Sequence, residues 1–104
     1  MKAYNVCFLQ EALDDLEEIV LYIAQDSPKA ALNMHDKIIA KARDLATFPK
    51  RGRLVPDKKM GASGYRILVI EPYMAFYRVI DNNVFIYRVL HGATNYPLLY
   101  KKMV

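Results

Sequence analysis

The sequence has little of the residue types on which disulfide scaffolds and metal sites depend. It contains one cysteine and two histidines among 104 residues. A single cysteine cannot form an intramolecular disulfide, and these three residues lie far apart along the chain. We therefore expect no disulfide and no metal site. Cys7 lies within an apolar stretch, and we expect it to be a small buried side chain.

Long apolar runs and common enzyme motifs are missing as well. No segment approaches the ~20 consecutive apolar residues that cross a membrane, and residues 1–7 contain no apolar core of a secretory signal. The chain has no phosphate-binding glycine loop, no dinucleotide-binding motif, no HExxH and no CxxC. These absences exclude most nucleotide, metal and redox chemistry. They predict a cytoplasmic protein that uses no cofactor and does not enter a membrane.

What the sequence does contain is an uneven distribution of charge along a chain of one-domain length, residues 1–104. Residues 1–47 carry five Lys or Arg and eight Asp or Glu, a net charge of −3. Residues 48–104 carry ten Lys or Arg and three Asp or Glu, a net charge of +7. This division predicts a basic surface for an anionic partner, such as RNA, DNA, the ribosome or an acidic protein. The alternative is a basic surface that only contacts solvent.

Hydrophobic periodicity predicts one short strand and two helices in the first half. Residues 2–9 are rich in strand-forming residues, and apolar residues recur at helical spacing from Glu11 to about Gln25. Ser27 followed by Pro28 is typical of a helix start, and the second helix is expected to end near Ala46. The short connection between the two helices predicts an antiparallel helical hairpin.

The second half has a basic loop followed by strand periodicity. Residues 47–49 end the second helix, and residues 50–64 are rich in Gly, Pro and charge, which predicts a basic loop. Strands are expected over residues 65–70, 73–80 and 84–91, with a tight turn at 81–83, and residues 96–100 form a possible last short element. The order is β-α-α-β-β-β. We expect an α+β fold in which the helical hairpin packs on one face of a largely antiparallel sheet.

Arginine, tyrosine and histidine side chains recur along the predicted strands. Strict alternation places Ile86 and Arg88 on one side of the last strand and Tyr87 and Val89 on the other. Such groups could cleave RNA without a metal ion, because His and Tyr transfer protons and Arg stabilises phosphate charge. They could equally bind an anionic surface, or serve only packing and ion pairing.

The candidate site residues follow from this reasoning. If the protein is a ribonuclease, the candidate catalytic residues are Arg66 and His91. The candidate binding residues carry a positive charge or a phenol, and they are Lys50, Arg51, Arg53, Lys58, Lys59, Arg78, Arg88 and Tyr77.

Taken in order, these elements resemble the RelE/ParE toxin superfamily of type II toxin–antitoxin systems. The resemblance covers nearly the whole chain, and it extends to a P-x-x-G-R loop and a V-L-H-G close of the last strand. The matching segments are Ala12–Ile19, Tyr22–Ile23, Leu45–Pro49, Arg51–Arg53, Gly64–Leu68, Tyr73–Val79 and Val84–Gly92.

This resemblance implies a toxin that is encoded with an antitoxin and wrapped by it in a hetero-oligomer. RelE-like members cut mRNA in the ribosomal A site, with Lys and Arg on the sheet and a Tyr or His near the C-terminus. ParE-like members poison DNA gyrase. We expect an acidic antitoxin segment that folds on binding. A third alternative is a repurposed domain that only binds its antitoxin.

The expected ribonuclease residues are incomplete in this chain. Met74 follows Tyr73 where RelE-like ribonucleases carry an Arg, and Ala93 and Thr94 occupy the region of a second Arg. A C-terminal Tyr is matched only loosely, by Tyr96 or Tyr100. Lost charge stabilisation at the scissile phosphate weakens transition-state binding. The sequence therefore favours a ParE-like gyrase inhibitor over a RelE-like ribosome-dependent mRNA endonuclease.

Overall fold

The computed structural model describes residues 3–92, in which three helices, a 3-10 turn and five strands follow one another. The predicted order of one strand, two helices and three strands is confirmed, with two short elements added. The expected element at residues 96–100 lies outside the described residues. The elements are β1 (Asn5–Phe8), α1 (Gln10–Ala24), α2 (Pro28–Arg43), the 3-10 turn η1 (Asp44–Ala46), β2 (Arg53–Leu54), α3 (Lys58–Ala62), β3 (Arg66–Ile70), β4 (Tyr73–Ile80) and β5 (Asn83–His91).

The five strands form one sheet in the order β1-β5-β4-β3-β2. The strands β3, β4 and β5 form the predicted antiparallel meander, and β2 extends it at one edge. The first strand closes the other edge and runs parallel to β5, with Val6 opposite Val84 and Phe8 opposite Ile86. The parallel pairing requires a crossover connection, which the helical hairpin provides. The α+β class expected from the sequence is confirmed.

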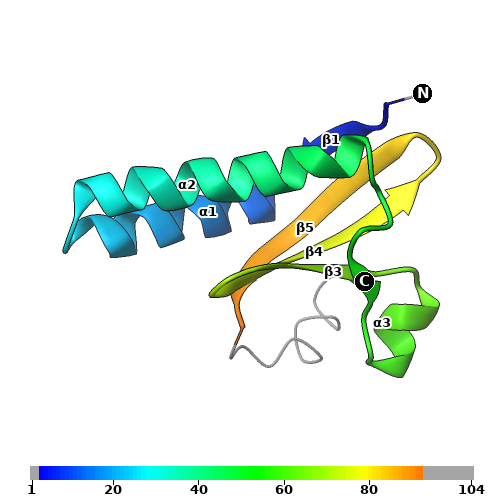
Figure 1. The fold of residues 1–104 in the computed structure, drawn as a ribbon. Coiled ribbons are helices and arrows are strands. Elements are labelled where there is room, and N and C mark those ends of the chain that lie inside the picture. The colour runs from blue at the N-terminus through cyan, green and yellow to red at the C-terminus, as the bar shows by residue number, and fades with distance from the viewer. Residues whose placement is uncertain (1–2, 93–104) are drawn as a thin grey trace.

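The helices α1 and α2 form an antiparallel hairpin that covers one face of the sheet and projects beyond it (Figure 1). The hydroxyl of Ser27 accepts the N–H of Ala30 at 3.1 Å, and Pro28 occupies the first position of α2. Both residues therefore act as the sequence predicts. The main core lies between hairpin and sheet, where Leu16 and Ile38 are buried against Ala75 and Ile86. Burying each such Leu or Ile side chain contributes ~2 kcal/mol.

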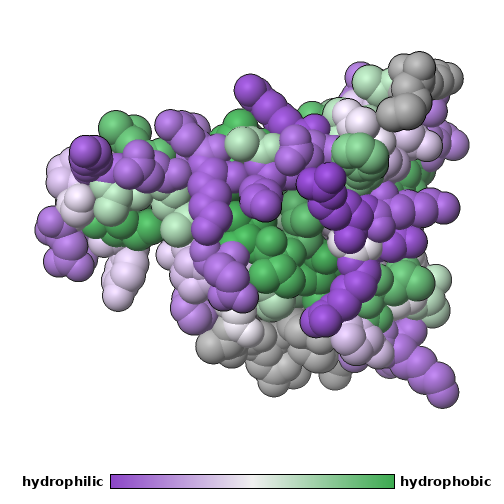
Figure 2. Space-filling model, viewed as in Figure 1, coloured by the Kyte–Doolittle hydropathy of each residue, from purple (hydrophilic) through white to green (hydrophobic). Residues whose placement is uncertain are grey.

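A smaller core lies on the opposite face of the sheet, and it corrects the prediction of a plain loop over residues 50–64. The carboxylate of Asp57 accepts the N–H groups of Lys59 and Met60 at 3.1 Å each and so begins α3. Met60 is fully buried there and packs in one cluster with Phe76. Figure 2 shows an apolar area at the surface between α2 and α3.

The last strand contains an irregularity that changes which side chains share a face. Phe76 pairs with Arg88 and Tyr77 pairs with Ile86, so that Tyr87 is an extra residue in β5. Strict alternation fails at this β-bulge. Val89 therefore joins Ile86 in the core beneath the helices, whereas Tyr87 packs against the cluster on the opposite face. The predicted grouping of Tyr87 with Val89 is wrong for this reason.

Candidate functional site

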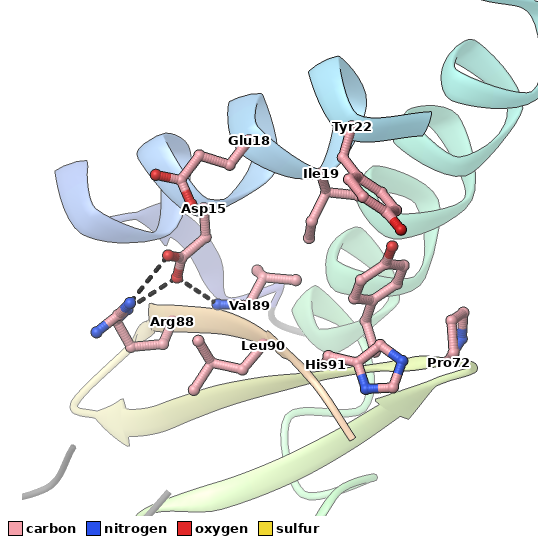
Figure 3. Close-up of a pocket in the computed structure, with 10 residues that line it drawn as sticks. Asp15, Glu18, Ile19, Tyr22, Pro72, Arg88, Val89, Leu90 and His91 are labelled. Atoms are coloured by element: carbon pink, nitrogen blue, oxygen red, sulfur yellow. Dashed lines mark hydrogen bonds and ion pairs between the residues drawn. The ribbon is translucent and has the colours of Figure 1, made fainter. Parts of the chain in front are cut away.

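A buried ion pair joins α1 to the bulged part of β5. The carboxylate of Asp15 accepts two hydrogen bonds from the Arg88 guanidinium, at 2.8 and 3.0 Å (Figure 3). The same carboxylate also accepts the backbone N–H of Val89 at 2.9 Å. Asp15 is the buried charged residue among the described positions, with 9% of its surface exposed. One side chain thus fixes helix and strand together.

The local course of the chain explains why a carboxylate is needed there. β1 accompanies β5 only as far as Ile86, where the N–H of Leu9 donates to the Ile86 carbonyl at 2.9 Å. Beyond that point no strand among residues 3–92 borders this side of β5, and the Val89 N–H needs another acceptor. The α1 helix crosses here and supplies Asp15. The hydrogen bond to Asp15 raises the pKa of Arg88 above its ordinary value, so the guanidinium stays protonated.

A groove of about 560 Å³ lies beside this ion pair, between α1 and the end of β5. Ile19 and Val89 form part of its apolar floor, and the Tyr73 ring contacts His91 edge-on at 5.9 Å between centroids. Tyr22 stands over the groove with 72% of its surface exposed (Figure 3). The groove therefore combines apolar, phenolic and charged side chains. Its lining residues are Asp15, Glu18, Ile19, Tyr22, Pro72, Tyr73, Arg88, Val89, Leu90 and His91.

A second arrangement anchors the basic loop at the far end of the sheet. The backbone N–H of Gly52 donates to the Tyr77 hydroxyl at 2.9 Å, and Arg66 donates to the Gly52 carbonyl at 2.7 Å. A Cβ at position 52 would lie 2.4 Å from the Ile67 carbonyl oxygen, so only glycine fits. Burial raises the pKa of Tyr77, while the Gly52 hydrogen bond and the Arg66 charge act in the opposite direction.

A third group lies on the sheet face opposite the helices. The Arg78 guanidinium carbon lies 5.1 Å from the centroid of Tyr65 and 5.9 Å from that of Tyr87. The two tyrosine rings meet edge-on at 5.1 Å, and Arg78 lies within 3.5 Å of the Tyr87 hydroxyl. The bulge in β5 is what directs Tyr87 to this face. A half-buried cation between two phenols can bind an anion or stack on a planar ring.

The expected binding residues fall into groups with different surroundings. Lys50, Arg53, Lys58 and Lys59 are exposed, whereas Arg51 pairs with Asp44 at 3.5 Å and lies over the Phe48 ring at 4.8 Å. Of the other three, Arg78 remains half-buried on the sheet. Arg88 is neutralised by Asp15, and Tyr77 is fully buried, so its observed role is to hold Gly52. Cys7 is half-buried rather than buried.

The two candidate catalytic residues are not neighbours. Arg66 pairs with Tyr77 on β4, whereas His91 pairs with Tyr73, four residues away on the same strand. Four residues span about 13 Å along a strand, and crossing from β3 to β5 adds about 10 Å. Buried core residues beneath the hairpin lie between them. Arg66 and His91 cannot both contact one phosphate in this arrangement.

Sequence reasoning missed Asp15 and Gly52, and both had a weak signal. Asp15 falls at helical spacing with Ala12, Leu16 and Ile19, all of which are buried. An acid on the apolar stripe of a helix needs a buried partner, which periodicity alone does not identify. Among residues 3–92, no group of three His, Cys, Asp or Glu is placed to hold a metal ion. No helix in that range has the length and apolar character to cross a membrane.

Comparison with known proteins gives consistent matches over this fold. Residues 6–96 match the family described as the ParE toxin of the type II toxin–antitoxin system parDE. A curated relative, Toxin RelE2 of Caulobacter vibrioides, is 39% identical over 89 residues, covering 86% of this chain and 96% of the relative. Similarity in sequence therefore points to one family over most of both chains.

Solved structures with the same fold come from three such systems. The chromosomal ParDE system from P. aeruginosa has a TM-score of 0.71 at 23% identity, over 86% of this chain and 96% of that chain. The toxin–antitoxin complex RelBE2 from Mycobacterium tuberculosis has a TM-score of 0.64 at 26% identity, over 90% of this chain and 97% of that chain. A mutant of E. coli toxin RelE in the free state has a TM-score of 0.66 at 17% identity, over 98% of this chain and 99% of that chain. The likenesses below 25% identity establish the fold alone.

Proposed function

Because the chain belongs to the ParE toxin family of type II toxin–antitoxin systems, we propose that it arrests bacterial growth by binding DNA gyrase. Its role as the toxin of such a system follows from the family. What we propose beyond the family is its target, DNA gyrase. We further propose that residues 1–104 form a single cytoplasmic toxin domain without a cofactor, held with its antitoxin in a hetero-oligomer.

The separation of Arg66 and His91 carries this proposal. A metal-independent ribonuclease must place a proton-transferring group and a phosphate-stabilising cation around one phosphate. Here Arg66 holds the Gly52 carbonyl, and His91 packs against Tyr73 at the other end of the sheet. A toxin that acts by binding needs no such set. The exposed basic loop and Arg78 then serve as contact residues rather than catalytic ones.

The alternative target is mRNA on the ribosome, and two observations favour it. The relative with 39% identity bears the name RelE2. The Arg78 guanidinium between Tyr65 and Tyr87 is a surface on which a phosphate could bind and a base could stack. Cleavage would require proton transfer close to Arg78, for which Tyr65 and Tyr87 are the neighbouring candidates. In this alternative Arg66 and His91 contribute to catalysis from separate positions or not at all.

The test is induced expression without antitoxin, with growth, RNA 5′ ends and the DNA damage response followed in one culture. We expect growth arrest, a DNA damage response and no new RNA ends inside translated frames. Purified protein should inhibit gyrase supercoiling, and Arg53→Ala should weaken that inhibition. Lys29→Ala is the matched control, because Lys29 is an exposed cation on α2, away from the basic loop.

Each other outcome has a definite meaning. New RNA ends at codon boundaries without a DNA damage response would overturn the gyrase proposal in favour of the ribonuclease. Normal growth would indicate a domain that only binds its antitoxin.

A further inference from the structure

The groove between α1 and β5 is an apolar surface with no covering element among residues 3–92. Ile19 and Val89 lie at its base, and Tyr22 and Glu18 stand at its α1 rim (Figure 3). Tyr73 also lines the groove. Glu18 and Ile19 lie three and four residues after Asp15, and Tyr22 lies four and three residues after them, so all four share one face of the helix. Tyr22 is 72% exposed, so its ring is accessible to an occupant of the groove.

The charge of this groove is negative once its internal ion pair is counted. Asp15 and Arg88 neutralise each other through two hydrogen bonds. Glu18 remains, exposed and with no ion-pair partner among the described residues. The helix behind it reinforces this sign, because α1 carries five Asp or Glu and no Lys or Arg. An occupant with complementary charge is therefore basic at this point.

The backbone at the base of the groove restricts how an occupant can bind. An added strand would pair with the outward N–H and C=O groups of β5 beyond Ile86. The N–H of Val89 is already bound by Asp15 at 2.9 Å. A sixth strand would have to displace a buried carboxylate that also holds Arg88. Side-chain docking of an amphipathic segment avoids that cost.

We propose that this groove binds an amphipathic segment of the antitoxin that places a Lys or Arg opposite Glu18 and apolar side chains over Ile19 and Tyr73. The inference rests on the protein being the toxin of a toxin–antitoxin pair. It also changes the expected chemistry of the partner. An acidic segment suits the basic loop of residues 50–59, but the part that lies along α1 is basic and apolar. The antitoxin therefore carries both kinds of segment.

The chain offers a matched pair of variants for the test. Glu17 and Glu18 are adjacent, exposed acids on α1 that line different depressions, since Glu17 borders a hollow with Leu13, Val20 and His35. Glu18→Lys and Glu17→Lys change the net charge equally. Purified cognate antitoxin is titrated calorimetrically into each variant, and neutralisation of growth arrest is scored for the same pair in cells.

We expect Glu18→Gln to weaken antitoxin binding about threefold and Glu18→Lys about tenfold, the range of partly exposed ion pairs. Glu17→Lys should leave affinity within about twofold. Replacing the facing Lys or Arg of the antitoxin by Glu should restore binding to Glu18→Lys. Tyr22→Ala, which removes an exposed ring and leaves the core intact, should also weaken binding.

Three results would overturn the inference. Unchanged affinity of Glu18→Lys would show that the groove is not the contact. Equal weakening by both Lys variants would indicate general attraction to an acidic helix. Loss of binding in Glu17→Lys alone would place the partner in the hollow between α1 and α2. If the unsubstituted protein arrests growth and is neutralised while these results hold, the proposed function stands and only the groove assignment fails.

Discussion

Replacing Asp15 by alanine should be among the most damaging single substitutions in α1. The change leaves the Arg88 guanidinium without its carboxylate and the Val89 N–H without its acceptor. Removing one partner of a buried ion pair costs about 3–5 kcal/mol, and an unsatisfied buried N–H costs about 1–3 kcal/mol. The two side chains keep 11% and 20% of their surface exposed, so water can replace part of these contacts.

Because of this partial exposure, we expect a total loss near the lower limit, about 3 kcal/mol of unfolding free energy. For a chain of this length, that loss lowers the melting temperature by about 15 °C. Asp15→Asn should cost less, about 2 kcal/mol, because the amide oxygen still accepts the Val89 N–H. Urea denaturation followed by circular dichroism measures both values.

The control is Asp14→Ala, on the same helix. Asp14 is exposed, and within the described part of the chain its side chain accepts one hydrogen bond, from Gln10 at 2.9 Å, so its loss should cost under about 0.5 kcal/mol. A double-mutant cycle of Asp15→Ala with Arg88→Ala should give a coupling of about 2 kcal/mol. A loss below about 1 kcal/mol for Asp15→Ala, or additive effects in the cycle, would refute the assignment.

Three further predictions concern the anchor of the basic loop. Gly52→Ala should destabilise the protein by about 1–3 kcal/mol, because its Cβ would lie 2.4 Å from the Ile67 carbonyl oxygen; an unchanged urea midpoint would contradict this. Burial raises the pKa of Tyr77, so the fold favours the neutral phenol, and stability should be full below about pH 10 and fall above it. Tyr77→Phe should lose about 1 kcal/mol at neutral pH and show a smaller alkaline decline, measured from pH 8 to 11.5 by denaturation. Arg66→Ala frees the Gly52 carbonyl, and trypsin should then cut after Arg51 faster than in the unsubstituted protein; equal rates would show that the anchor does not depend on Arg66.

The architecture was predictable because its signals are local and repeated. Apolar residues at helical spacing identified both helices, and Ser27 with Pro28 located the start of the second. The meander followed from three strand-forming runs and a turn signal. The parallel pairing of β1 with β5 had no such signal, since it joins residues about eighty positions apart. Its cause is the crossover through the hairpin, which only the packed structure reveals.

The two short elements at residues 53–62 show where periodicity fails. A helix of five residues, Lys58–Ala62, is shorter than two turns and has one buried anchor, Met60. Its stability comes from the Asp57 cap and from packing against β3 and β4. The composition of this segment alone therefore predicts a loop. An Asp followed three positions later by an apolar residue was the available signal, and it is common in true loops.

The sequence predicted which residue types occur in the candidate site, but it did not predict which of them contact one another. Alternation assumes a regular strand, and one extra residue, Tyr87, reverses the faces beyond it. As a result Val89 enters the core beneath the helices, and Arg88 meets Asp15 rather than solvent. A bulge has no reliable sequence signal, because the bond that stabilises it comes from another element. Tyrosines and arginines could be named from the sequence, but their partners could not.

The fold places negative and positive charge at different ends of the sheet, just as the sequence places them in different halves of the chain. Asp15 and Glu18 of α1 border the groove at β5, and the cations of residues 50–59 lie at the opposite end of the sheet, where Gly52 is anchored. On these proposals gyrase meets the basic loop, whereas the basic and apolar segment of the antitoxin meets the groove. A variant that weakens antitoxin binding through Glu18 should therefore keep its effect on growth. If Glu18→Lys lost toxicity while remaining as stable as the unsubstituted protein, the two surfaces would not be independent.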